Sequence, residues 1–253
     1  MTQLMGVVNV APDSFSGDGI YLDPERAAER AVELVAAGAA VIDVGGESTR
    51  PGATPISLAE ELRRVVPAIE HIVRSVTAPA SVDTSKSEVA RPALAAGAAI
   101  VNDVSGLRDA ALPAVAASAG ATLVLVHNRP LARGVDLVNQ VIDELRRLIT
   151  AAEAAGVERV IVDPGLGFSK GWRENLVILR RLRELAVLGK PLMVGPSRKG
   201  MIGRVLGTEV DDRVEGTLAL VSLAAARGAD LIRVHDVAQM SRAVRMIDAI
   251  VRS

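Results

Sequence analysis

Short runs of β-branched and other apolar residues alternate with longer amphipathic stretches along the whole chain. The apolar runs predict eight strands, at residues 4–10, 40–44, 80–83, 99–102, 122–126, 159–163, 191–194 and 230–234. The amphipathic stretches predict eight helices, at residues 24–37, 57–73, 86–96, 109–119, 136–155, 174–188, 211–227 and 238–251. Because right-handed βαβ units repeated eight times close on themselves, the pattern predicts an α/β protein with a single (β/α)8 TIM barrel over residues 1–253.

Local signals at the predicted boundaries favour the same fold. Asp23 before Pro24 and the pair Ser57 and Glu60 are typical of helix starts. Five predicted helices end at a glycine that leads directly into a strand: Gly38, Gly97, Gly120, Gly156 and Gly228. A doubly wound open sheet is the alternative, but the first strand is not followed by the glycine-rich phosphate loop that such a sheet commonly carries.

Composition narrows the classes of function. The net charge of −1 and the pI of about 6.3 do not indicate a nucleic acid or an anionic membrane as partner. The absence of cysteine excludes disulfides, thiolate catalysis and cysteine-ligated zinc. No apolar run reaches the ~18 residues of a membrane span, and the start MTQLMGVVNV is typical of a first strand, not a signal peptide. We therefore expect a cytoplasmic protein.

Three polar residues end predicted buried strands: Asp83, Asn102 and Asp163. Each alone is explained as a cap or turn residue. Carboxyl ends of the strands form the active-site face of a barrel, however, and a buried polar group is costly without a partner. Three of them at one rim favour a site for a flat ligand rich in hydrogen-bond donors.

Basic residues follow the last two predicted strands at the same rim. Arg233 and His235 alternate, so both side chains face one side, and Ser197 and Lys199 follow the seventh strand. A solvated basic pair is the alternative for Arg198 and Lys199, and it suits Arg198 better. Aromatic residues make up only 2% of the chain, so an arginine is the expected partner for the face of a flat ligand. No cysteine or Ser-His-Asp arrangement offers a nucleophile.

Seven segments carry a resemblance to one known family. They are MGVVNVAPDSFSGDG, IDVGGESTRPGA, SVDTSK, VNDVSGL, DPGLGFSK, GPSRKGMIG and RVHDV. In this order, spread over essentially the whole chain, they resemble the dihydropteroate synthases of folate biosynthesis. The resemblance implies a pterinylmethyl transferase that condenses 6-hydroxymethyl-7,8-dihydropterin pyrophosphate with p-aminobenzoate, giving 7,8-dihydropteroate and pyrophosphate. It also implies competition by sulfonamides, which mimic p-aminobenzoate.

The resemblance assigns roles to individual residues, all as expectations. Asp83, Asn102 and Asp163 match the pterin-recognising positions, and Lys199, with Ser197 beside it, is expected to reach the pterin and the aromatic acid. Arg233 and His235 match pyrophosphate-binding positions, with Arg233 also covering the pterin face. Thr49 and Arg50 are expected to contact pyrophosphate or p-aminobenzoate, and Phe168 to flank the aryl ring, although loop packing also explains Phe168. The expected cofactor is Mg2+, contacted by Asn9, and the expected assembly is a homodimer. Asp83, Asp163, Lys199 and Arg233 are the expected catalytic residues.

The chain also departs from the family pattern at several positions. Ala11 replaces a threonine, VHNRP replaces the usual Met-His-Met-x-Gly and places Val126 at a pterin-pocket position, and Gly200 removes a possible partner for the p-aminobenzoate carboxylate. We expect these departures to bear on p-aminobenzoate affinity and loop order more than on pterin binding. Two alternatives stay open: a methyltetrahydrofolate:corrinoid methyltransferase, which needs no pyrophosphate site, and a pterin-binding paralogue with lost or altered turnover.

Overall fold

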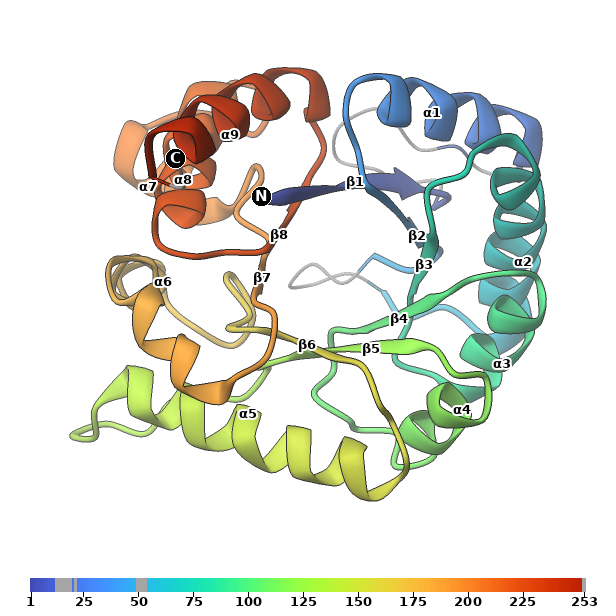
Figure 1. Cartoon of the computed structure of the whole chain (residues 1–253), viewed down its shortest axis with the longest axis horizontal. Helices are drawn as coiled ribbons and strands as arrows, with labels where there is room; N and C mark the ends of the chain where they lie inside the picture. The colour runs from blue at the N-terminus through green and yellow to red at the C-terminus, as the bar shows by residue number, and fades with distance from the viewer. Residues whose placement is uncertain (12–19, 21, 49–53, 252–253) are drawn as a thin grey trace.

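In the part of the chain that the structure describes, eight parallel strands form one sheet in the order β6-β5-β4-β3-β2-β1-β8-β7. The computed structural model describes residues 1–11, 20, 22–48 and 54–251. The strands are β1 (Gln3–Asn9), β2 (Val41–Gly45), β3 (Ala80–Asp83), β4 (Ile100–Asp103), β5 (Thr122–Val126), β6 (Val160–Asp163), β7 (Met193–Val194) and β8 (Leu231–Val234). A parallel bridge between Val162 and Leu192 joins β6 to β7, so the two ends of the sheet meet. The predicted barrel is therefore confirmed, and Figure 1 shows it ringed by helices.

Helices follow the strands as predicted, with differences in extent. They are α1 (Pro24–Ala36), α2 (Leu58–Ser75), α3 (Ser87–Ala95), α4 (Leu112–Ser118), α5 (Leu137–Ala154), α6 (Trp172–Arg180), α7 (Gly200–Leu206), α8 (Val214–Ala226), α9 (Val237–Val251) and the 3-10 helix η1 (Leu182–Leu188). The predicted caps form: the Asp23 carboxylate accepts the N–H of Arg26 at 3.0 Å, and the Ser57 hydroxyl accepts that of Glu60 at 3.2 Å.

Two regions differ from the predicted elements. The predicted helix 174–188 is divided into α6 and η1, because Leu182 and Leu185 are both buried and their spacing of three suits a 3-10 turn. The short helix α7 was not predicted. It begins at Gly200 and contains Gly203, and glycine is a weak helix former. A Cβ at Gly203 would lie 2.7 Å from the carbonyl oxygen of Thr208, so close packing accounts for the glycine.

The predicted helix-to-strand glycines adopt the expected left-handed conformation. Their φ angles are positive at Gly38, Gly97, Gly120, Gly156 and Gly228. At Gly38, with φ of +107°, a Cβ would also meet the Ser241 hydroxyl at 2.6 Å. These joints lie at the amino ends of the strands, opposite the rim where chemistry was predicted.

Successive residues of each strand point alternately outward, into an apolar core beneath the helices, and inward, into the barrel. The barrel interior is apolar in its lower part and more polar toward the carboxyl ends of the strands. Ile42, Val44 and Val82 face outward and pack against the helices. Inside the barrel, an apolar cluster is formed by Met5, Val41, Ile100, Val124, Val126, Met193 and Leu231. Since residues two apart share a face, positions further along the same strands continue the interior toward the carboxyl ends. Among those positions are Asp43, Asn102 and Arg233, which places polar side chains above an apolar floor.

Candidate active site

A cavity of about 630 Å³ opens at the carboxyl ends of the strands. Nine of the predicted site residues line it together: Asn9, Asp83, Asn102, Asp163, Phe168, Ser197, Lys199, Arg233 and His235. The two others, Thr49 and Arg50, lie outside the described residues. Eight strands converge here, so residues as far apart in sequence as Asn9 and His235 share one wall.

Arg233 connects the acidic residues of the cavity. Its Nε donates to Asp43 Oδ2 at 2.6 Å and its Nη2 donates to Asp83 Oδ2 at 2.9 Å. Asp43 Oδ2 also accepts the side-chain N–H of Asn102 at 3.2 Å. Asp43 is fully buried within β2 and received no role from the sequence. The signal that could have found it is its parity, because residue 43 faces inward like residues 41 and 45.

Three acceptor oxygens in this group are buried without a hydrogen-bond partner among the described residues. They are Asp43 Oδ1, Asp83 Oδ1 and Asn102 Oδ1. Because the Asn102 amide nitrogen is engaged by Asp43, its oxygen is the atom left for a ligand. Buried acceptors without partners are costly, so a ligand that donates several hydrogen bonds would be bound favourably.

Burial perturbs the titration of these groups. It raises the pKa of Asp83 to about 7, against the lowering effect of Arg233. It likewise raises the pKa of Asp163 to about 6, although the Gly165 N–H and the charge of Lys199 favour the ionised form. For Arg233, burial favours the neutral form, but Asp43 and Asp83 hold its pKa above the usual value. Carboxyls that titrate near neutrality in a cleft are typical of functional sites.

The loop after β6 is organised by Lys170, a residue that received no role from the sequence. Its ammonium donates to the carbonyl oxygens of His127, Gly165 and Phe168 at 2.9, 3.0 and 3.1 Å. Burial lowers the pKa of Lys170 to about 8. Asp163 Oδ1 accepts the Gly165 N–H at 2.6 Å. The loop thereby fixes both Asp163 and Phe168 at the cavity.

The residues after β7 and β8 form a second side of the cavity. The Ser197 hydroxyl lies 2.9 Å from His235 Nδ1, and Lys199 Nζ lies 4.5 Å from the centre of the Phe168 ring. Arg198 makes a two-pronged ion pair with Asp236 at 2.6 and 3.1 Å and lines the cavity, so it is not the solvated side chain that the sequence favoured. A Cβ at Gly200 would meet nothing within 4 Å, so the cavity is open at that point.

Among the described residues, no group of three or more His, Asp or Glu side chains could hold a metal ion. Asn9 offers one neutral oxygen, which also accepts the Ala11 N–H at 3.1 Å. Mg2+ commonly takes few protein ligands and completes its shell with water and substrate phosphates. The residues therefore fit an ion that arrives with a phosphate group, not a resident metal centre.

Comparison with known proteins agrees with this geometry. Residues 5–235 match the family model described as pterin binding enzyme. The chain belongs to the pterin-binding enzyme family. It is 44% identical over 251 residues to the dihydropteroate synthase of Bacillus subtilis, covering 98% of this chain and 88% of that protein.

Solved structures of family members extend the match to three dimensions. A Clostridium difficile dihydropteroate synthase, determined in the presence of pteroic acid, is 42% identical with a TM-score of 0.94, and the match covers 100% of this chain and 97% of that one. A Yersinia pestis dihydropteroate synthase in complex with a sulfonamide drug is 37% identical with a TM-score of 0.95, covering 100% and 95%. The expected family, barrel fold and transferase class are confirmed. Within the described ranges, no helix has both the length and the apolar character needed to cross a membrane.

Proposed function

We propose that this pterin-binding enzyme catalyses the dihydropteroate synthase reaction, joining 6-hydroxymethyl-7,8-dihydropterin pyrophosphate to p-aminobenzoate. The observation that carries the proposal is the set of unpartnered acceptor oxygens on Asp43, Asp83 and Asn102 beside Arg233. A pterin presents amino and ring N–H donors that match such acceptors. The relative from Clostridium difficile was solved with pteroic acid, which supports the same class of ligand here.

The pterin half of the site is formed by residues held on rigid strands. Asp83, Asn102 and Asp163 accept the donors of the ring, and Arg233 donates to Asp83 and to the neighbouring Asp43 in the barrel mouth. Lys199 and Phe168, stacked against one another, form the wall for the aromatic acid. Sulfonamides would occupy the aromatic-acid position and compete with p-aminobenzoate.

The pyrophosphate half of the site is formed by Arg233, His235 and Asn9. Positive charge and hydrogen-bond donors at this wall stabilise the charge that grows on the departing pyrophosphate. Asn9 would contact Mg2+, which when bound supplies further neutralisation of phosphate oxygens. His235 keeps its orientation through the hydroxyl of Ser197.

The reaction is a direct transfer in which pyrophosphate leaves first and the pterin methylene cation, stabilised by conjugation with the ring, is held against Asp83 and Asp163 until the amine attacks. The C–O bond between the pterin methylene and pyrophosphate breaks, and the amine nitrogen of p-aminobenzoate forms the new C–N bond and loses a proton. The enzyme supplies orientation and charge complementarity, without a covalent enzyme intermediate.

A pyrophosphate-release assay, with and without p-aminobenzoate and Mg2+, tests the proposal. Release that depends on both supports it. Pterin binding without release would instead favour a paralogue that has lost turnover. Methyl transfer from methyltetrahydrofolate to a corrinoid would favour the methyltransferase alternative.

The homodimer expected from the family remains part of this proposal. Helix α8 is apolar around its whole circumference, with the sequence VEGTLALVSLAAA, and a helix of that character is commonly buried. Helices α7, α8 and α9 lie side by side in Figure 1 and expose Val205, Leu206 and Met246. A second copy of the chain covering these helices would explain the exposed apolar surface. A cytoplasmic location also stays a prediction, which cell fractionation would test.

A further inference from the structure

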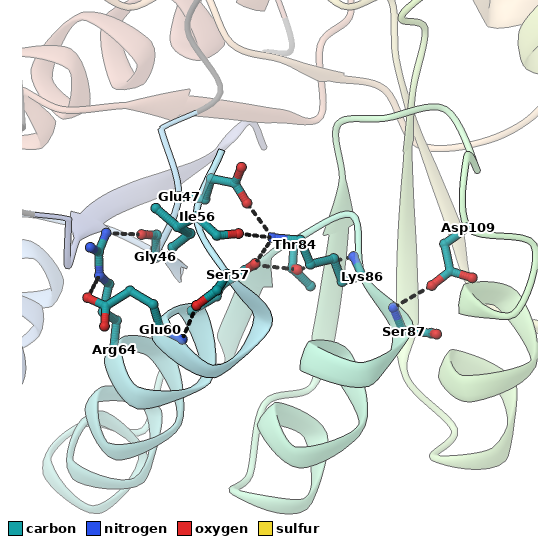
Figure 2. A network of polar contacts seen from close by, with 11 residues as sticks. Gly46, Glu47, Ile56, Ser57, Glu60, Arg64, Thr84, Lys86, Ser87 and Asp109 are labelled. Carbon is teal, nitrogen blue, oxygen red and sulfur yellow. Dashed lines mark hydrogen bonds and ion pairs between the residues drawn. The ribbon is translucent and has the colours of Figure 1, made fainter. Parts of the chain in front are cut away.

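Lys86 joins helix α2 to both described ends of the β2–α2 loop (Figure 2). Its ammonium donates to Glu61 Oε2 on α2 at 2.5 Å and to Glu47 Oε2 at 2.6 Å. A longer contact of 3.4 Å reaches the carbonyl oxygen of Ile56. None of these residues was singled out by the proposed reaction. Together they form a polar network next to the proposed substrate site.

The fixed end of the network is Glu61. Its side chain is 1% exposed, and a buried carboxylate is unfavourable unless it is paired and hydrogen-bonded. Glu61 Oε1 accepts the Thr84 hydroxyl at 2.6 Å, while Oε2 accepts Lys86. Thr84 directly follows Asp83 and donates its backbone N–H to the Asn102 carbonyl at 3.2 Å. The network is therefore built onto the strand ends that carry two of the pterin acceptors.

The other end of the network is the loop between β2 and α2. Glu47 lies two residues after β2 ends, and Ile56 lies two residues before α2 begins. Arg64 of α2 adds a third anchor by donating to the Gly46 carbonyl at 2.9 Å. Lys86 is thus the side chain that contacts both ends of the described part of this loop.

The anchored part of the loop belongs to the cavity wall. Glu47 and Ser48 line the cavity, and Gly45 pairs in register with Asn9 of β1. Asn9 is on the side where we place the pyrophosphate. Burial alone would favour neutral Lys86, but its bonds to Glu47 and Glu61 raise the pKa of Lys86 above the usual value. The ammonium form, which can hold two carboxylates, is therefore maintained.

We propose that Lys86 is a positioning residue for the pyrophosphate half of the substrate, acting through Glu47. By tying Glu47 to the buried Glu61, it fixes the first residues of the β2–α2 loop in the wall beside Asn9. The pterin ring is held separately by Asp83, Asn102 and Asp163, so its affinity does not depend on this link. The inference rests on the proposed function, since it concerns the pyrophosphate-bearing substrate of that reaction.

The test compares Lys86→Met and Lys86→Arg with the wild type in the pyrophosphate-release assay. Lys86→Met should raise the KM for dihydropterin pyrophosphate about tenfold, which corresponds to ~1.4 kcal/mol, with little change in kcat. The Kd for 6-hydroxymethyl-7,8-dihydropterin, measured by calorimetry, should stay within about twofold of the wild-type value, a much smaller change than the tenfold change in KM. Lys86→Arg should keep the KM close to the wild-type value, because arginine retains the positive charge that pairs with both carboxylates.

Lys190→Met is the matched control. Lys190 also makes a 2.6 Å ion pair, with Glu153, and its side chain is 25% exposed against 28% for Lys86. It immediately precedes the β7 region at the opposite end of the barrel, so its loss should leave the KM unchanged. An equal KM change in both variants, or an unchanged KM in Lys86→Met, overturns the proposal.

Glu47→Gln keeps the test decisive if Lys86→Met does not fold. That variant leaves Glu61 paired with both Lys86 and Thr84, and it weakens only the link to the loop. It should also raise the KM for dihydropterin pyrophosphate. The variant that combines Glu47→Gln with Lys86→Met should have the same KM as Lys86→Met alone, because both changes remove the same connection. If adding Glu47→Gln instead returns the KM of Lys86→Met toward the wild-type value, the increase came from repulsion between the two unpaired carboxylates, and the positioning role of Lys86 is wrong. If the wild type itself releases no pyrophosphate, the proposed function fails first.

Discussion

Three buried carboxyl groups, from Asp43, Asp83 and Asp163, meet at the barrel mouth around Arg233. Arg233 bonds to the first two, and Asp163 is held by the backbone of its own loop. Charges taken out of water are unfavourable unless partners replace the solvent. Asp43 Oδ1 and Asp83 Oδ1 have no hydrogen-bond partner among the described residues. The site is therefore built for a ligand that completes the hydrogen bonding.

The titration of Asp83 and Asp163 predicts how pterin binding depends on pH. Burial raises their pKa values to about 7 and about 6, so each carboxyl becomes protonated as the pH falls through those values. A protonated carboxyl accepts fewer hydrogen bonds from the ring, so kcat/KM for the pterin substrate should fall by up to about tenfold per pH unit for each group below its pKa. A pH–rate profile from pH 5 to 9 measures this. The acidic limb belongs to the two carboxyls together, and a flat profile down to pH 5 would contradict the assignment.

Asp43 offers a direct test of the arginine-centred arrangement. Asp43→Asn removes the charge that faces Arg233 Nε at 2.6 Å and weakens the orientation of Asn102. Bonds to charged groups contribute about 1.5–3 kcal/mol, so kcat/KM should fall roughly 10- to 100-fold. Asp248→Asn is the control. Asp248 is also buried and accepts the Thr2 N–H at 2.6 Å, but it lies at the other end of the barrel. That variant should lose stability and keep its catalytic constants.

At the scale of single residues, the sequence identifies a site residue when a polar residue ends an apolar run. Asp83, Asn102 and Asp163 each end such a run, so their convergence could be predicted from strand order alone. Asp43 lies inside a run, and only its pairing with Arg233, 190 residues away, shows what it does. Lys170 donates to three carbonyl groups of the loops after β5 and β6, and such contacts are not visible in composition or residue spacing.

At the scale of elements, the β6–α6 loop depends on a close approach of two backbone segments. Gly165 has a φ of +71°, and a Cβ there would lie 1.9 Å from the His127 carbonyl oxygen. That oxygen is also one of the acceptors of Lys170. The glycine therefore lets the loops after β5 and β6 share a single cation.

Gly165→Ala should damage both stability and activity. The left-handed conformation costs about 1–2 kcal/mol for a non-glycine residue, and the backbone clash adds to it, so a total of about 3 kcal/mol or more is expected. Gly189→Ala is the matched control, because Gly189 has a φ of +63° but open space around its Cβ. It should lose only the conformational part, ~1 kcal/mol. Urea unfolding measures the free energy of unfolding of both variants. Equal losses would contradict the prediction, because they would show that the close approach to the His127 carbonyl adds nothing to the cost.

The barrel was predictable because each strand and most helices repeat one pattern. The departures have local causes. The leucines of η1 favour a 3-10 turn because they are three residues apart. Helix α7 was not predicted because it contains two glycines, which are weak helix formers. Neither departure moves a predicted site residue away from the cavity, because those residues are placed by strands and by the loops that leave them.

At the scale of the whole molecule, the contact between the two ends of the chain and the candidate active site lie at opposite ends of the barrel. Near the amino ends of the strands, the Thr2 hydroxyl donates to Asp248 Oδ1 of α9 at 2.9 Å, linking the first strand region to the last helix. The carboxyl ends carry the polar cavity. The contact between the two ends of the chain therefore uses no residue of the cavity.

The apolar surface on α7, α8 and α9 predicts how the molecule assembles. Val205 on α7 is 56% exposed, and we place it in the contact between two copies. Val205→Asp introduces a charge that would be buried without a partner, so it should convert the dimer to a monomer and lower the thermal midpoint. Val32→Asp on α1 is the control. Val32 is 46% exposed on a different helix of the ring, and its replacement should leave the assembly unchanged (Figure 1). Size-exclusion chromatography with light scattering at micromolar concentration distinguishes the outcomes. A monomeric wild type would contradict the dimer, and a dimeric Val205→Asp variant would exclude α7 from its interface.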